Sequence, residues 1–172
     1  MLGKKEKLLK YIAIIILIVL PGCWFDKKSD ESKQKVSTEA SSLKVINLLS
    51  KELVDDATIV GSINIPMDKL EAEVKNWNRE TPIVVYCANY ACTSSAQAAK
   101  KLMKMGFKNV KAYEGGTAEW YQLGKTNPDY RIKGPAQQSY LSLELPKSPI
   151  EHSGIEVITA EELLKSMRDA GL

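Results

Sequence analysis

Two cysteines in one short segment are the residues best suited to chemistry in this chain. Cys87 directly follows the apolar run at residues 83–86, and Cys92 follows Cys87 after four residues. A cysteine reacts as the thiolate, which a tight loop and the start of a helix favour through their N–H groups and dipole. The same N–H groups can hold an anion or the charged end of a persulfide. We therefore predict a reactive sulfur at Cys87. The alternative is a buried, inert cysteine at a strand end.

The segment around these cysteines is a polar loop, and it carries no charged residue from Cys87 to Gln97. The C-x4-C spacing allows either an intramolecular disulfide or attack by one thiol on a persulfide held by the other. Cys92 is accordingly either a resolving thiol or a small residue that packs the loop. The remaining loop residues are Ala88, Asn89, Tyr90, Ala91, Thr93, Ser94 and Ser95, among which Tyr90 either lines a pocket or is exposed.

Strand and helix patterns alternate on both sides of this loop. Helical spacing appears in Leu70, Val74 and Trp77, and again in Ala98, Leu102 and Met105, and a short helix is expected around residues 117–123. Strands interleaved with helices predict an α/β fold, with a mostly parallel central sheet covered by helices on both faces. Ligands of such sheets bind at the carboxyl ends of strands, which is where Cys87 lies. The predicted strands are residues 44–49, 59–65, 83–86 and 109–113.

The C-terminal part of the chain is expected to end in a helix. Residues 125–154 are rich in Pro, Tyr, Gln and Ser and carry no clear period, so we expect them to wrap the surface. Thr159 and Glu162 have the spacing of a capping box, and Leu163, Leu164 and Met167 follow at helical spacing. This pattern predicts a terminal helix docked on the domain. A helix that binds a partner is the alternative.

The N-terminal segment has the features of an export signal. Four lysines precede the apolar run at residues 11–20, which is shorter than the roughly 20 residues that span a bilayer but long enough for a signal peptide. Leu20-Pro21-Gly22-Cys23 resembles the lipobox of bacterial lipoproteins. The resemblance implies a signal peptide at residues 1–22, a lipid anchor on Cys23, and a location in the cell envelope on the extracytoplasmic side. Only Val36 and Ala40 are apolar between residues 26 and 42, so we expect residues 23–42 to be a flexible tether. An uncleaved anchor or an ordinary signal peptide is the alternative.

Charge and ligand counts exclude several classes of function. Residues 1–22 hold four Lys and one Glu, a net charge of +3 that equals the +3 of the whole chain, so the rest is formally neutral. We expect no nucleic-acid partner, because no basic stripe is present. Cys87, Cys92 and His152 are too few soft ligands for a closed zinc site, and we expect no metal and no cofactor. Thr93 stands where a C-x5-R phosphatase loop needs arginine to bind phosphate, so we do not expect phosphatase chemistry.

Several motifs together resemble the rhodanese-like family over residues 43–124. In that family the cysteine matching Cys87 takes a sulfane sulfur from a donor such as thiosulfate, becomes a persulfide, and passes the sulfur to a thiol or another nucleophile. The resemblance implies a catalytic Cys87 in a rhodanese-like domain, followed by a C-terminal extension at residues 125–172. The matching segments are Gly61-Ser62-Ile63-Asn64-Ile65-Pro66, Ile83-Val84-Val85-Tyr86-Cys87, Ala96-Gln97-Ala98-Ala99-Lys100-Lys101-Leu102, Gly106-Phe107-Lys108-Asn109-Val110, Tyr113-Glu114-Gly115-Gly116 and Glu119-Trp120.

The chain departs from the family pattern at three places. Asn47-Leu48-Leu49 replaces a frequent Asp-x-Arg pair, the active loop lacks a cationic residue, and the loop is longer than usual with a second cysteine. Three hypotheses follow. The first is a sulfurtransferase that uses Cys87, the second a non-catalytic binding module, and the third a thiol redox protein that uses Cys87 and Cys92.

Overall fold

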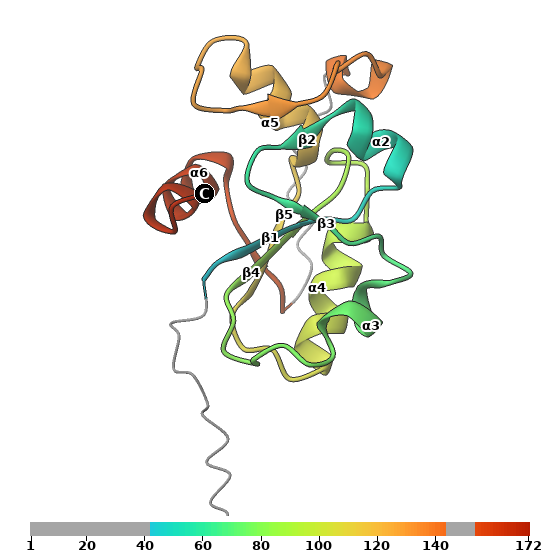
Figure 1. Ribbon diagram of the computed structural model, residues 1–172, viewed down its shortest axis with the longest axis vertical. Coiled ribbons are helices and arrows are strands. Elements are labelled where there is room, and N and C mark those ends of the chain that lie inside the picture. The colour runs from blue at the N-terminus through green and yellow to red at the C-terminus, as the bar shows by residue number, and fades with distance from the viewer. Residues whose placement is uncertain (1–41, 144–153) are drawn as a thin grey trace, which may run out of the picture. The chain divides into compact units, whose positions relative to one another are not determined.

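A five-stranded parallel sheet forms the centre of the domain (Figure 1). The computed structural model describes residues 42–143 and 154–172. The strand order is β3-β1-β4-β5-β7, and every neighbouring pair runs parallel. The predicted α/β class with a mostly parallel sheet is therefore confirmed. The strands are β1 (Lys44–Asn47), β3 (Ile63–Asn64), β4 (Ile83–Tyr86), β5 (Val110–Tyr113) and β7 (Glu156–Val157).

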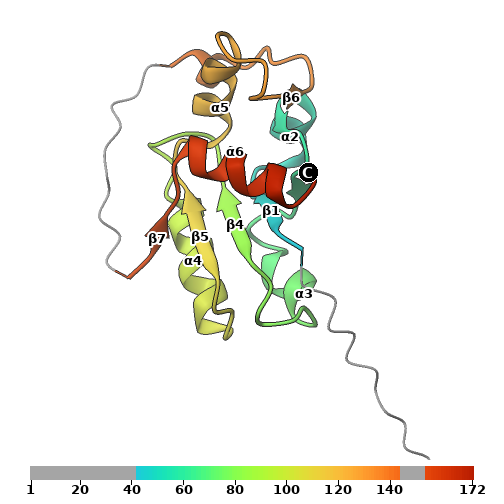
Figure 2. The same ribbon diagram turned by 90° about the vertical axis from the view of Figure 1, so that its left-hand side faces the viewer.

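Helices cover both faces of this sheet. In Figure 1, α3 and α4 lie on one side and α6 lies on the other, and Figure 2 shows α6 crossing in front of the strands. The helical elements are α2 (Lys51–Asp56), α3 (Leu70–Val74), α4 (Ser94–Lys104), α5 (Gly116–Gly124), the 3-10 helix η1 (Ser139–Ser142) and α6 (Ala160–Asp169).

Successive residues of the central strands feed two separate cores. Ile46 and Val85 pack with the residues of α3 and α4, whereas Val45 and Val84 pack with those of α5 and α6. Successive strand side chains point to opposite faces of a sheet, so a strand buried on both faces must be apolar at every position. All four residues of β4 are buried, which explains the unbroken apolar run before Cys87.

The prediction of one strand at residues 59–65 is wrong. The chain turns at Gly61, whose φ is +90°, and the Ser62 hydroxyl donates to the carbonyl of Ile59 at 2.7 Å. This turn separates β2 (Thr58–Ile59) from β3. Strand β2 pairs antiparallel with β6 (Ile132–Lys133) in a second, two-stranded sheet.

The predicted helices are present, with one shorter than its periodicity indicated. Helix α3 ends at Val74, and Trp77 lies beyond it, where its N–H donates to the Val74 carbonyl at 3.0 Å and its side chain packs half-buried on the core. Gly106 follows α4 with a φ of +93°, the left-handed backbone conformation typical of a glycine that ends a helix.

The C-terminal extension completes both the sheet and one core. Thr159 and Glu162 form the predicted capping box, with the Glu162 N–H donating to the Thr159 hydroxyl at 3.3 Å. Leu163 and Met167 are buried on the sheet, so a terminal helix docked on the domain is confirmed. Strand β7, which the sequence did not indicate, adds the edge next to β5.

Several predictions concern residues outside those that the structure describes. They are the signal peptide at residues 1–22, the anchor on Cys23 and the tether up to residue 41. His152 also lies outside the described residues. Within residues 42–143 and 154–172, no helix is both long and apolar enough to cross a bilayer.

Candidate functional site

Cys87 lies at the carboxyl end of β4, as predicted, and its side chain is fully buried. The loop of residues 88–93 covers it, and α4 begins directly afterwards at Ser94. A helix of this length places partial positive charge at its first turn. The sulfur of Cys87 therefore sits beneath a loop that is bounded by a buried strand and a helix N-terminus.

A disulfide joins Cys87 and Cys92, whose Cα atoms lie 6.4 Å apart. Cys92 is half-buried, so this second sulfur is the more accessible member of the pair. The Cys87 sulfur also lies 3.3 Å from the Cys92 carbonyl oxygen and 3.9 Å from the Ser95 hydroxyl. The structure thus brings together the two thiols that the sequence placed in one loop.

Asn89 shapes the loop so that Cys92 returns to Cys87. Its side-chain oxygen accepts the Ala91 N–H at 3.1 Å, and its carbonyl accepts the Cys92 N–H at 2.9 Å. The first of these bonds is an Asx turn, a motif that asparagine favours at tight reversals. An asparagine two residues after Cys87 was the available sequence signal for this turn, and sequence reasoning did not use it.

The first turn of α5 holds the backbone of Cys87 from the other side. The N–H groups of Thr117 and Ala118 donate to the carbonyls of Cys87 and Ala88 at 3.0 and 2.9 Å. Gly116 has a φ of +60°, and a Cβ there would lie 2.4 Å from the Cys87 carbonyl oxygen. The absence of a side chain at Gly116 therefore permits this close approach.

A buried polar network fixes the end of β4 next to Cys87. The Tyr86 hydroxyl lies 2.7 Å from the Ser62 hydroxyl and accepts the Ile59 N–H at 3.2 Å. Burial raises the pKa of Tyr86 above its ordinary value. The Asn47 amide donates to the Thr58 hydroxyl, which also contacts Tyr86, at 3.1 Å in each case. Asn47, which departs from the family's Asp-x-Arg pattern, is thus a buried structural residue here.

Carboxylates and tyrosines line a hollow of about 400 Å³ beside the loop. Tyr90 lines it, which answers the question that the sequence left open, together with Glu114 and Glu119. The pKa of Tyr90 is raised chiefly by burial, then by a hydrogen bond to Glu119 and by the charges of Glu119 and Glu114. Glu161 is the other charged residue of this lining, so all the charged residues that line the hollow are acidic.

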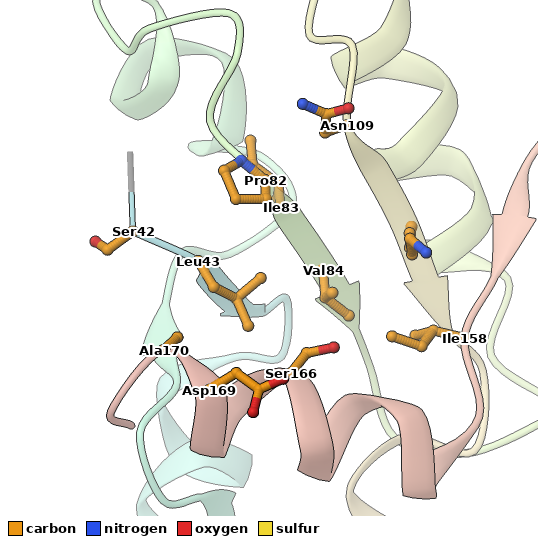
Figure 3. A pocket seen from close by; sticks show the side chains of 11 residues that line it. Ser42, Leu43, Pro82, Ile83, Val84, Asn109, Ile158, Ser166, Asp169 and Ala170 are labelled. Atoms are coloured by element: carbon orange, nitrogen blue, oxygen red, sulfur yellow. The ribbon is translucent and has the colours of Figure 1, made fainter. Parts of the chain in front are cut away.

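A larger cavity, of about 450 Å³, lies at the opposite ends of the strands, as Figure 3 shows. Leu43, Val84 and Ile158 form its apolar wall, on the side of the sheet that faces α6. It contains no residue of the Cys87 loop. Across residues 42–143 and 154–172, no cluster of three or more His, Cys, Asp or Glu side chains could hold a metal ion.

Comparisons with known proteins give one family. The model of the "Rhodanese-like domain" matches residues 29–123, more than half of the 172-residue chain. Thiosulfate sulfurtransferase GlpE of Shewanella oneidensis is 28% identical over 85 residues, covering 49% of this chain and 82% of its own length. GlpE of Coxiella burnetii is 28% identical over 76 residues, covering 44% of this chain and 69% of its own length.

One relative is much longer than the segment it shares with this chain, and two solved structures are similar to part of the chain. The adenylyltransferase and sulfurtransferase UBA4 of Meyerozyma guilliermondii is 32% identical over 85 residues, which are 45% of this chain and 20% of UBA4. A crystal structure from Bacillus halodurans is 25% identical, with a TM-score of 0.48, covering 59% of this chain and 71% of that one. A Rhodanese_3-like domain from Anabaena is 24% identical, with a TM-score of 0.44, covering 48% and 94%. On the family match across residues 29–123, the chain belongs to the rhodanese-like family.

Proposed function

We propose that this protein is a sulfurtransferase that carries sulfane sulfur as a persulfide on Cys87. The observation that carries the proposal is the position of Cys87, at the carboxyl end of β4 and directly before a loop that enters α4. Relatives named as sulfurtransferases support the same chemistry. The non-catalytic alternative gains no support from this geometry.

The proposed reaction needs the Cys87–Cys92 disulfide to be reduced first. The Cys87 thiolate then attacks the outer sulfur of a donor such as thiosulfate. The sulfur–sulfur bond of the donor breaks, sulfite leaves with the bonding electrons, and Cys87 becomes a persulfide. A thiol or another nucleophile finally accepts the outer sulfur and restores the Cys87 thiolate.

The charges near the loop bear on the choice of donor. Residues 87–97 carry no charge, and the hollow beside Tyr90 is lined by Glu114, Glu119 and Glu161. An anionic donor is repelled by such carboxylates and must rely on backbone N–H groups. We therefore expect an organic persulfide, which carries less negative charge than thiosulfate, to load Cys87 faster than thiosulfate does.

The test loads the reduced protein with thiosulfate and, separately, with a small organic persulfide, which leaves as its thiol when its outer sulfur bonds to Cys87. Mass spectrometry of the peptide that contains Cys87 should show the addition of one sulfur atom. Cys87→Ser is the control that should stay unmodified. If neither of these two donors places sulfur on Cys87, the sulfurtransferase proposal fails.

The disulfide favours a second candidate, thiol–disulfide exchange by Cys87 and Cys92 without any sulfane sulfur. In that case the oxidised protein should oxidise a dithiol substrate, with a reversible mass change of two hydrogen atoms per chain. Failure of the oxidised protein to exchange with any dithiol tried would remove this candidate.

The location of the activity is a separate part of the proposal. We propose that a lipid on Cys23 holds the protein in the cell envelope, because Leu20-Pro21-Gly22-Cys23 resembles a lipobox. Expression in a bacterial host with a labelled fatty acid should give a labelled protein in the membrane fraction, and Cys23→Ser should lose the label. Equal labelling of both would contradict lipidation at this residue.

A further inference from the structure

We propose that Cys92 is a second catalytic residue, which resolves the persulfide on Cys87 and releases its outer sulfur as sulfide. The inference rests on the proposed function. In this step the Cys92 thiolate attacks the inner sulfur of the Cys87 persulfide, and the bond between the inner and outer sulfur breaks. The outer sulfur leaves as hydrosulfide, and a Cys87–Cys92 disulfide forms. The sulfane sulfur is reduced to sulfide while the two cysteine sulfurs are oxidised.

The disulfide in the structure is the product of this step. The Cα atoms of Cys87 and Cys92 are 6.4 Å apart, within the usual range of roughly 4.4–6.8 Å for a bridge. The attacking and attacked sulfurs can therefore bond without a rearrangement of the backbone. Two cysteines that only packed the loop would not need to meet in this way.

The loop is built to hold this geometry. Asn89 accepts the Ala91 N–H through its side chain and the Cys92 N–H through its carbonyl, at 3.1 and 2.9 Å. On the other side, the N–H of Thr117 holds the Cys87 carbonyl at 3.0 Å. Fixed geometry of this kind gives an intramolecular attack a very high effective concentration, of about 10⁵ M or more in favourable cases. Asn89 is accordingly a positioning residue for Cys92.

Burial favours internal attack over direct transfer to a large acceptor. Cys87 is fully buried, whereas Cys92 is half-buried and lies nearer the surface of the loop. The same difference in burial decides which sulfur a reductant attacks when the two thiols are regenerated. An external dithiol attacks the Cys92 sulfur, Cys87 leaves as the thiolate 3.9 Å from the Ser95 hydroxyl, and the second thiol of the reductant then frees Cys92. The required co-reactant is thus a dithiol reductant.

The experiment is a single turnover of the reduced full chain carrying Cys23→Ser, so that only Cys87 and Cys92 remain as thiols. One equivalent of a small organic persulfide is added without reductant, its thiol leaves when Cys87 takes the outer sulfur, and sulfide, Cys87 persulfide and disulfide are followed in time. The parent with Cys23→Ser should release one sulfide for each disulfide formed. The added change Cys92→Ser should keep the persulfide at least about 10-fold longer and release no stoichiometric sulfide.

Two further variants separate a positioning role from loss of the fold. Asn89→Ala should slow sulfide release by about 10-fold while sulfur uptake on Cys87 is kept, because the Asx turn is lost. Asn89→Asp keeps the acceptor oxygen and should restore the rate. Loss of both sulfur uptake and release in Asn89→Ala, or no change in release, overturns the role of Asn89.

The outcomes distinguish the inference from the function on which it rests. If the Cys92→Ser chain takes up no sulfur on Cys87 from any donor, the sulfurtransferase proposal itself is lost. If that variant and its parent hold the persulfide equally long, sulfur transfer stands and the resolving role of Cys92 is overturned.

Discussion

The hydroxyl of Tyr113 donates a hydrogen bond to Oε2 of Glu119 at 3.0 Å, across the first turn of α5. Burial is the largest cause of the raised pKa of Tyr90, in the loop after Cys87, and the same carboxylate raises this pKa further through a hydrogen bond and its charge. A Cβ at Gly115 would lie 1.9 Å from Oε2, so the glycine leaves room for Glu119 to fold back. One carboxylate therefore links the end of β5, the start of α5 and the loop.

Glu119→Gln should reduce the loss of stability at alkaline pH. Burial, then the charge and hydrogen bond of Glu119, hold the pKa of Tyr113 well above its ordinary value, and Tyr90 is affected similarly. Above about pH 10 an unfolded tyrosine loses a proton that these two retain when folded, so the free energy of unfolding falls by up to about 1.4 kcal/mol per pH unit per tyrosine. A neutral glutamine lowers the folded-state pKa of Tyr90 and of Tyr113, and so narrows the pH range over which stability is lost.

Urea unfolding from pH 8 to about 11 measures the effect. The stability difference between the wild type and Glu119→Gln should shrink towards the upper end of this range, once the pH reaches the lowered folded-state pKa of the tyrosines in the variant. Glu161→Gln is the control, because the Glu161 charge raises the pKa of Tyr130 and is not among the causes for Tyr90 or Tyr113. A difference that stays constant with pH for Glu119→Gln contradicts the prediction.

Gly116→Ala should damage both the fold and the site. The new Cβ would meet the Cys87 carbonyl oxygen at 2.4 Å, and the φ of +60° adds strain. We expect a loss of more than about 2 kcal/mol of stability and slower sulfur uptake on Cys87. Gly106→Ala is a matched control, because its φ is +93° and its nearest neighbour is Arg79 Cδ at 4.0 Å. It should cost only about 1–2 kcal/mol and leave uptake unchanged. Equal effects in both variants would refute the steric argument.

Asp56→Ala should destabilise the connection that follows β6. The Asp56 carboxylate accepts the Gln137 and Gln138 N–H groups at 2.9 and 3.1 Å, and its side chain is buried. Hydrogen bonds to a charged group contribute about 1.5–3 kcal/mol each, so we expect the loss of both to cost about 3–6 kcal/mol in chemical unfolding. The neighbouring Asp55 makes an exposed ion pair with Lys51, so Asp55→Ala should cost less than about 1 kcal/mol. A similar loss from both changes would show that the buried contacts contribute little.

The sequence predicts those parts of the fold that show helical spacing over several turns or an unbroken run of apolar residues. The apolar run that becomes β4 located Cys87 at the carboxyl edge of the sheet, and the helical spacing of Ala98 and Leu102 located α4. Strand β7 has only two residues, Glu156 and Val157, and both are exposed. A strand of two residues has no alternation to detect in the sequence, and its place beside β5 depends on tertiary pairing.

Tertiary geometry also decides most of the site. The spacing of Cys87 and Cys92 allowed a disulfide, but its closure depends on the turn at Asn89. The contact between Tyr86 and Ser62 joins residues that are 24 positions apart, and polar residues so distant carry no pattern that links them. Sequence reasoning therefore located the two cysteines of the loop and missed the side chains that support them.

Leu163→Ala tests whether the C-terminal extension is part of the domain or a separate unit. Leu163 is fully buried in the core that also contains Val45 and Val84, whereas Leu164 is half-buried. Removing a buried leucine costs about 2–5 kcal/mol, so Leu163→Ala should lower the midpoint of urea unfolding far more than Leu164→Ala.

The fluorescence of the buried Trp120 and the far-UV circular dichroism should report this loss together. If α6 is integral to the domain, the two signals change in a single transition, because a cooperative unit unfolds as a whole. Suppose instead that the helix signal is lost first while the Trp120 signal keeps its wild-type midpoint. The domain then folds without α6, and the boundary predicted after residue 124 is a true folding boundary.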